Sequence, residues 1–217
     1  MRGPCVAAIC VVVAVWLACP GVVAPATAAT RATLAVDSTT SRVRIALGRS
    51  GMLKFMGHDH TIEAPVESGR VEIVEGDPVR SSVSLRFESR RLAIVPGTEP
   101  AGDVPVVEAR MHGPEVLDVE RFPAITFESS AVAVEPPPEG ASNAPGTLRL
   151  RVRGTLAVKD RAVTLEIPLA ARRDVDGLTV AGEASLDLRS LGIEPPSVAG
   201  VVKVASRFRL SFEVHAR

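Results

Sequence analysis

The sequence predicts an all-β fold, an antiparallel up-and-down barrel of about eight strands with one short helix packed against it. Three observations lead to this prediction. Apolar and polar residues alternate along most of the chain, turn-forming residues separate the alternating segments, and no long helical segments separate one strand from the next. Because successive side chains of a strand point to opposite faces of a sheet, such alternation describes strands with one buried and one solvated face.

Residues 147–158 show the alternation most clearly. The even-numbered positions include the apolar residues Leu148, Leu150, Val152, Leu156 and Val158. The odd-numbered positions include the polar residues Arg149, Arg151, Arg153 and Thr155. A helix would distribute these arginines around its circumference, so a strand is the better interpretation. The same period recurs in residues 43–47, 83–87, 125–128, 163–169, 178–187 and 202–214. The pattern slips near Ser129 and Ser130, which indicates a β-bulge.

The connections between these segments predict hairpins and one helix. Lys159-Asp160 and Asp176-Gly177 lie between adjacent strands at hairpin spacing. Residues 136–145 predict a loop because they are rich in proline, which cannot donate to a strand ladder. From Asp103 to Leu117 the alternation stops and a helix is expected. Its features are helical spacing of Val106, Val107, Arg110 and Met111, Pro105 in the first turn, and Gly113-Pro114 at the end.

Strands with one apolar face must bury that face in a sandwich or a closed barrel. Several of the alternating segments exceed the usual strand length of roughly 5–6 residues. Long strands joined by hairpins favour the barrel, which also removes exposed sheet edges. A barrel of about eight strands is wide enough to hold one small ligand.

The N-terminal segment has the pattern of a secretory signal peptide, which we place at residues 1–28, before a single domain at residues 32–217. Arg2 is its only charge, an apolar run follows from Val6 to Ala18, and Ala26-Thr27-Ala28 offers a cleavage site. The apolar run is shorter than the roughly 20 residues of a spanning helix. We therefore expect a periplasmic or secreted protein, and lipoprotein anchoring at Cys19 is the alternative.

Composition excludes several classes of function. All three cysteines precede residue 20, so the mature chain would have no disulfide. The 25 basic and 25 acidic residues balance, and Tyr is absent, so we expect no nucleic-acid partner. No later segment is long and apolar enough to be a transmembrane helix.

The histidine motif Gly57-His58-Asp59-His60 has three interpretations. Two histidines at i and i+2 of a strand face the same way and could form half of a zinc or copper site, completed by His112, His215 or a carboxylate. They could instead form structural hydrogen bonds at the barrel mouth. The third interpretation is a polar anchor for the headgroup of a ligand.

Catalysis has little support in the sequence. The chain has no G-x-S-x-G motif and no cysteine after the predicted signal peptide. Four carboxylates that could take part in catalysis, Glu72, Glu88, Glu128 and Glu166, occupy positions on the solvated face of their strands. The row of Arg149, Arg151 and Arg153 is best explained as a solvated face, paired with carboxylates such as Glu166 on the next strand. We therefore expect a protein that is not an enzyme and that uses no cofactor.

Several motifs, in order and spacing, resemble the YceI-like family. They are Phe55-Met56-Gly57-His58-Asp59-His60-Thr61 after an opening Leu34-Ala35-Val36-Asp37, then Arg121-Phe122-Pro123-Ala124-Ile125-Thr126-Phe127-Glu128-Ser129-Ser130, then Gly154-Thr155-Leu156-Ala157-Val158-Lys159-Asp160 with Val163-Thr164-Leu165-Glu166-Ile167-Pro168, and Leu191-Gly192-Ile193. The resemblance extends from Ala32 to Val214. Many members have one histidine where this chain has His58 and His60, and many have Trp where this chain has Leu34.

The resemblance implies a lipocalin-like barrel with a helix beside it, in an exported protein that encloses a polyisoprenoid or quinone-type lipid. We therefore expect an apolar lipid as the partner, and a homodimer is left open. The candidate ligand-binding residues are Phe55, His58, His60, Phe87, Phe127, Leu165, Ile167 and Phe208. Two other functions compete with this one. They are a metal-linked or redox-associated protein that uses His58 and His60, and a filled barrel that acts as a stress-protective or partner-binding module.

Overall fold

A computed structural model describes residues 30–50, 60–139, 142, 144–198 and 202–217. Its strands are β1 (Arg31–Ala35), β2 (Arg42–Ser50), β3 (His60–Glu63), β4 (Val66–Val74), β5 (Ser82–Glu88), β6 (Ala93–Ile94), β7 (Ala124–Glu135), β8 (Thr147–Val158), β9 (Arg161–Asp174), β10 (Gly177–Asp187), β11 (Ser197–Val198) and β12 (Val202–Ala216). The helices are α1 (Val104–His112) and the short 3₁₀ turns η2 (Pro78–Arg80), η3 (Ser89–Arg91) and η4 (Leu188–Leu191). The predicted signal peptide lies outside the described residues.

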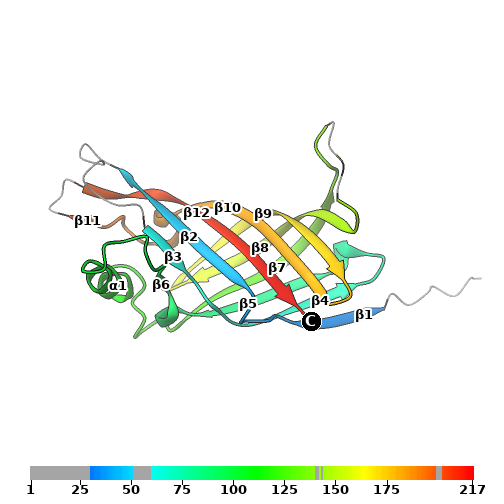
Figure 1. The fold of residues 1–217 in the computed structure, drawn as a ribbon, viewed down its shortest axis with the longest axis horizontal. Coiled ribbons are helices and arrows are strands. Elements are labelled where there is room, and N and C mark those ends of the chain that lie inside the picture. The colour runs from blue at the N-terminus through cyan, green and yellow to red at the C-terminus, as the bar shows by residue number, and fades with distance from the viewer. Residues whose placement is uncertain (1–29, 51–59, 140–141, 143, 199–201) are drawn as a thin grey trace, which may run out of the picture.

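One antiparallel sheet contains all twelve strands of the described residues and curls into a barrel (Figure 1). Its order is β1-β4-β5-β7-β8-β9-β10-β12-β2-β3-β6, and β11 pairs with β12. The sheet closes on itself at one end, where Val36 bridges Ala216, and Ala35 and Arg217 exchange backbone hydrogen bonds of 2.8 and 2.9 Å. The predicted all-β barrel with one helix is therefore confirmed, with more strands than the expected eight.

Five strands are not among the predicted segments, namely β4, whose nine residues include a register shift between Val66 and Ser68, and four short strands. β1, β3, β6 and β11 contain between two and five residues, too few for a period of two to stand out in the sequence. The long strands β7 to β10 and β12 follow the predicted alternating segments and form the body of the barrel.

The predicted bulge and the Lys159-Asp160 turn are confirmed, whereas the second turn lies one residue earlier than predicted, at Val175-Asp176, because Gly177 already pairs with Asp174. The register of β7 against β8 shifts between Ser129 and Ala131. At the bulge the Ser129 hydroxyl accepts a hydrogen bond of 2.8 Å from the backbone N–H of Val83 on β5. Lys159 adopts a positive φ of 54° in the tight β8–β9 turn, a conformation that two-residue hairpins require.

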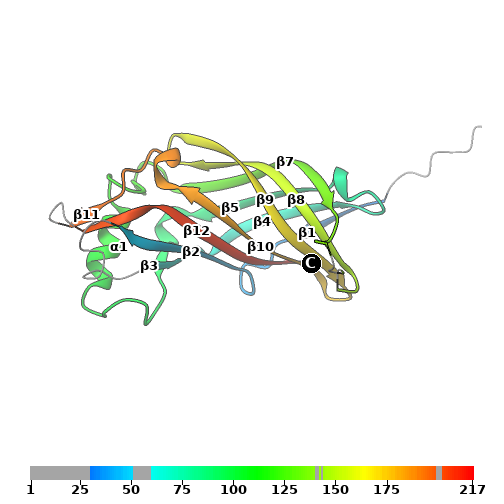
Figure 2. The same ribbon diagram turned by 90° about the horizontal axis from the view of Figure 1, so that it is seen from above.

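α1 is the only α-helix in the described part of the chain, and it lies at the end of the barrel away from the C terminus (Figure 2). Met111 is buried in the main hydrophobic cluster. The backbone N–H of Ile94 on β6 donates to the Glu108 carboxylate over 2.9 Å, and His112 Nε2 lies 2.8 Å from the Leu92 carbonyl oxygen. The helix ends at His112, before Gly113, as the sequence predicts.

The alternation of β8 separates interior from exterior as expected. Leu150, Val152 and Val158 are buried, whereas the arginines between them are exposed. Arg151 forms an ion pair with Glu135 on β7, with Nε–Oε1 at 2.6 Å. Arg153 lies opposite Glu166 in the β8–β9 register. The arginine row is thus part of a solvated face beside carboxylates on both neighbouring strands.

None of the helices in the described ranges combines the length and the apolar character that a membrane span requires.

Candidate ligand-binding cavity

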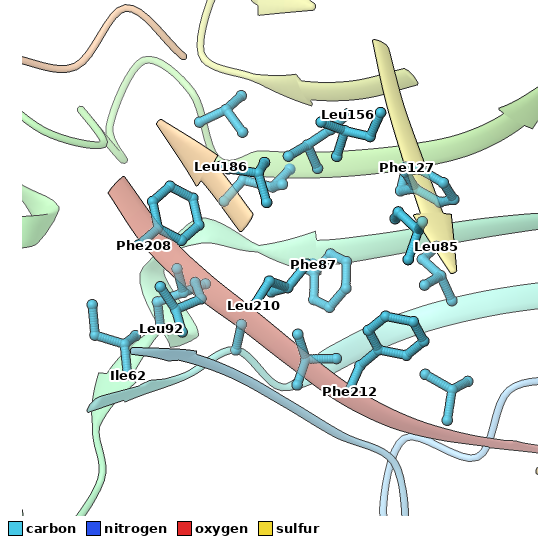
Figure 3. A pocket seen from close by; sticks show the side chains of 18 of the residues that line it. Ile62, Leu85, Phe87, Leu92, Phe127, Leu156, Leu186, Phe208, Leu210 and Phe212 are labelled. Atoms are coloured by element: carbon cyan, nitrogen blue, oxygen red, sulfur yellow. The ribbon is translucent and has the colours of Figure 1, made fainter. Parts of the chain in front are cut away.

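The inward faces of the strands enclose an elongated cavity of about 760 Å³. Its wall consists mainly of aliphatic and phenylalanine side chains from β2, β5, β7, β8, β9, β10 and β12. Figure 3 shows such side chains converging from different strands on a common interior, among them Leu85, Phe87, Leu156, Leu186 and Leu210. The volume falls in the range of roughly 300–1,000 Å³ that is typical of small-molecule sites.

Four phenylalanine rings line this cavity, namely Phe87, Phe127, Phe208 and Phe212. Two of them lie against inward-facing glycines. A Cβ atom on Gly154 would be 2.7 Å from Phe127 Cε2, and one on Gly182 would be 2.7 Å from Phe212 Cζ. Because real Cβ contacts are longer than this, the two glycines let the rings lie close to the barrel wall, and the centre stays open.

Polar groups lie at the two ends of the cavity. At the end opposite α1 the lining includes Ser82 and Arg173, and Arg173 Nη1 forms an ion pair of 3.2 Å with Glu75 Oε1. At the α1 end the lining includes His60, Glu99 and Asp103. Between the two ends the wall is apolar, so the cavity suits a long apolar molecule with polar groups at its ends.

His60 and Glu99 form the most buried polar pair of the cavity wall. His60 Nδ1 lies 2.5 Å from Glu99 Oε1. The Glu99 side chain is 2% exposed and the His60 side chain 23%. β3 pairs with β6, and a turn from Val95 to Thr98 then reverses the chain and brings Glu99 back to the start of β3.

The structure places most of the predicted site residues around this cavity. His60, Phe87, Phe127, Leu165, Ile167 and Phe208 line it. Phe55 and His58 lie outside the described residues. Sequence reasoning missed Glu99 and Phe212 as site residues. Phe212 lies on the buried parity of β12, so the alternation was a signal for it, whereas nothing in the sequence around Glu99 indicates a buried carboxylate.

The two histidines suggested as further metal ligands have other contacts. His112 Nε2 faces the Leu92 carbonyl, and His215 lies 3.2 Å from the Thr179 hydroxyl and 3.1 Å from Glu213. Among the described residues there is no group of three or more histidine, cysteine or acidic side chains that could hold a metal ion. His58 is not one of those residues.

Solved structures that share the fold of this chain include two with TM-scores near 0.6. The crystal structure of BcnA from Burkholderia cenocepacia is 18% identical with a TM-score of 0.60, and the match covers 82% of this chain and 98% of that one. A polyisoprenoid-binding domain from Saccharophagus degradans is 12% identical with a TM-score of 0.59, and the match covers 85% and 97% of the two chains. At these identities the likeness establishes the fold alone.

No curated protein matches the chain. The model of the YceI-like domain matches residues 34–216, which include every strand from β2 to β12 and the whole cavity wall. The match confirms the resemblance seen in the motifs. The chain therefore belongs to the YceI-like family.

Proposed function

We propose that this protein binds an apolar lipid of the isoprenoid or quinone type inside its barrel and carries or sequesters it without chemical change. The observation that carries the proposal is the cavity of about 760 Å³, whose wall between the two polar ends is aliphatic and aromatic. Such a wall offers burial to hydrocarbon and few groups that could act on it.

Burial of hydrocarbon supplies a large part of the free energy that binding requires. Each methylene group removed from water contributes about 0.8 kcal/mol. Ten such groups contribute about 8 kcal/mol, which corresponds to a Kd near 1 μM before the cost of association is subtracted. A long hydrocarbon chain can therefore be held with few polar contacts, which fits the composition of the wall.

The fold comparison supports this choice of ligand. The Saccharophagus degradans structure that shares this barrel is described as a polyisoprenoid-binding domain. Most of the predicted ligand contacts, Phe87, Phe127, Leu165, Ile167 and Phe208, are spread over β5, β7, β9 and β12. A ligand that contacts all of them is surrounded by side chains from several strands.

Export is part of the proposal. The basic, apolar and small-residue regions of residues 1–28 support cleavage after Ala28 and a periplasmic or secreted location. Intact-mass measurement of the protein from its own host tests this, because cleavage after Ala28 leaves a chain that starts at Ala29. A mass that includes residues 1–28 would contradict export by this route.

Native mass spectrometry of protein purified from its own host tests whether the protein carries a lipid. We expect an adduct that organic extraction releases as an isoprenoid or a quinone-type lipid. Metal analysis of the same preparation examines the alternative role of His58 and His60. Protein that carries no lipid, and that takes up none from isoprenoid-containing vesicles, would rule out the proposed function.

A matched pair of tryptophan substitutions on β8 localises the binding. Leu156 lines the cavity, whereas its neighbour Thr155 is exposed on the outer face. Overpacking typically costs about 1–3 kcal/mol, so Leu156→Trp should weaken lipid binding roughly 5- to 150-fold. Thr155→Trp should bind as the wild type does. Equal binding by both variants would place the lipid outside the barrel.

A further inference from the structure

The His60–Glu99 pair is an energetically costly feature in a mainly apolar wall. A buried carboxylate is costly unless it is hydrogen-bonded and compensated in charge. The partner that the described residues supply to Glu99 is the His60 ring, at 2.5 Å. The ring itself is partly open, with 23% of its side chain exposed, and it lines the cavity.

From this geometry we infer that His60, oriented by Glu99, is a polar subsite that recognises the hydroxyl group of an isoprenoid alcohol at the α1 end of the cavity. The inference rests on the proposed function and deepens it, because it names the chemical group at one end of the lipid. Glu99 is a positioning residue, and His60 is the residue that contacts the ligand.

The hydrogen-bonding capacity of the imidazole ring selects this group. The contact with Glu99 occupies Nδ1, which leaves Nε2 as the ring atom for a ligand. In the neutral ring Nε2 accepts a hydrogen bond, and in the imidazolium it donates one. A hydroxyl group can donate and accept, so it pairs with Nε2 in either state. A carbonyl or ether oxygen can only accept.

The surroundings of His60 leave room for a headgroup. His60 also lines a second hollow of about 390 Å³, together with residues of β2, β3, β10 and β12. The register of β12 against β2 shifts between Val204 and Phe208 beside this hollow. His60 therefore lies at the α1 end of the apolar cavity and close to exposed polar side chains of the outer face, namely Ser185, Arg207 and Arg209, which suits the polar end of a lipid.

The test compares three ligands that share one hydrocarbon chain, namely geranylgeraniol, its methyl ether and the corresponding hydrocarbon. The measured quantity is the ratio of the alcohol affinity to the hydrocarbon affinity, taken for the wild type and for His60→Asn. The Asn amide nitrogen is as many bonds from Cβ as Nδ1, so it can still donate to Glu99, and no atom replaces Nε2. We expect the ratio to fall about three- to tenfold in His60→Asn.

Two further variants control this experiment. Thr155→Ala removes a hydroxyl from the exposed outer face of β8, outside the cavity, and should leave the ratio unchanged. The double variant His60→Leu/Glu99→Leu replaces the whole pair with apolar side chains, an exchange that folded proteins often tolerate. It should lower the ratio as His60→Asn does, and it tests the polar subsite in its place if His60→Asn does not fold.

The outcomes separate the two proposals. If the wild type binds all three ligands, and both His60→Asn and the double variant keep the wild-type ratio, the polar subsite is wrong and the lipid-binding barrel stands. If the methyl ether binds the wild type as tightly as the alcohol, hydroxyl recognition is wrong. If the wild type binds none of the three, the proposed function fails and the subsite fails with it.

Discussion

At the scale of single residues, Gly154 shows how the lack of a side chain at one position lets an aromatic ring pack against the barrel wall. It faces inward on β8, where a Cβ atom would be 2.6 Å from the Glu128 carbonyl oxygen and 2.7 Å from Phe127 Cε2. Neither neighbour is the flexible end of a long side chain. The backbone of β7 or the aromatic ring must therefore move if any larger residue takes this place.

We predict that Gly154→Ala lowers the free energy of unfolding by about 1–3 kcal/mol, the usual cost of overpacking. Urea denaturation measures the change. Gly48→Ala on β2 is the matched control, because a Cβ there has nothing within 4 Å, and this variant should be as stable as the wild type or slightly more stable. Equal stability of the two variants would contradict the steric explanation.

Asp37 is a second residue whose environment leads to a testable prediction. It lies where β1 meets β12. Its backbone N–H donates to the His215 carbonyl over 2.8 Å, and its carboxylate pairs with Arg217 at 2.8 Å. Hydrogen bonds from the Thr39 hydroxyl and then the Thr39 backbone N–H, with the charge of Arg217, lower the pKa of Asp37 to about 2.

This lowered pKa predicts how acid weakens the protein. The unfolded chain, with an Asp pKa of about 3.9, takes up the proton more readily than the folded one. The contribution of Asp37 is therefore complete above about pH 4 and lost as the pH falls to about 2. We expect Asp37→Asn to be less stable than the wild type at pH 6, with a gap that narrows between pH 4 and pH 2. Urea denaturation at each pH measures the difference in free energy of unfolding, and a difference that stays constant with pH would contradict this prediction. Asp160→Asn on the exposed β8–β9 turn is the control.

At the scale of elements, most of the long strands and the helix could be predicted from the sequence, whereas the strand pairings that close the barrel could not. β8 and β12 are long enough for a period of two to be evident, and α1 has Pro105 and Gly113 at its boundaries. The pairing of β2 with β12 and of β3 with β6 joins segments far apart in the chain. Alternation shows which face of a strand is buried but not which strand lies beside it.

The candidate site also contains residues that the sequence predicts and residues that it does not. Phe127 and Ile167 could be predicted as cavity residues because they stand on the buried parity of long strands. The contact between His60 and Glu99 depends on the short β3–β6 pairing and on the turn after it, which has no pattern in the sequence. Polar residues brought together by loops are therefore the part of such a site that requires a structure.

The hydrogen bond between α1 and β6 leads to a prediction at the scale of elements. The Glu108 carboxylate accepts the hydrogen bond of the buried Ile94 N–H, so it ties the helix to β6. Glu108→Ala leaves this N–H without its partner, at a cost of about 1–3 kcal/mol. We expect faster hydrogen exchange at the Ile94 amide and faster release of bound lipid. Glu115→Ala, which removes an exposed ion pair with Arg110, should change neither rate. Unchanged exchange at Ile94 in Glu108→Ala would show that this contact does not hold the helix.

At the scale of the whole molecule, the barrel combines a stable wall with an interior that its own side chains leave open. The ladders from β7 to β10 supply backbone hydrogen bonds all along the wall, while inward glycines keep two phenylalanine rings against it. A ligand that enters the cavity adds contacts to side chains from opposite sides of the barrel at once, so the stability of the whole molecule should respond to it.

We predict that the lipid raises the melting temperature of the protein. A ligand that binds only the folded state at a free concentration of 100 times its Kd stabilises that state by about 2.7 kcal/mol. For a chain of this size, 1 kcal/mol shifts the melting temperature by about 2–4 °C, so the expected rise is roughly 5–10 °C. Differential scanning calorimetry of extracted protein, before and after loading with geranylgeraniol, measures it. Leu156→Trp should show a smaller rise at the same lipid concentration because its cavity is partly filled, and Thr155→Trp should show the full one. A rise in the wild type that Leu156→Trp fully retains would mean that the lipid stabilises the protein from a surface outside the barrel.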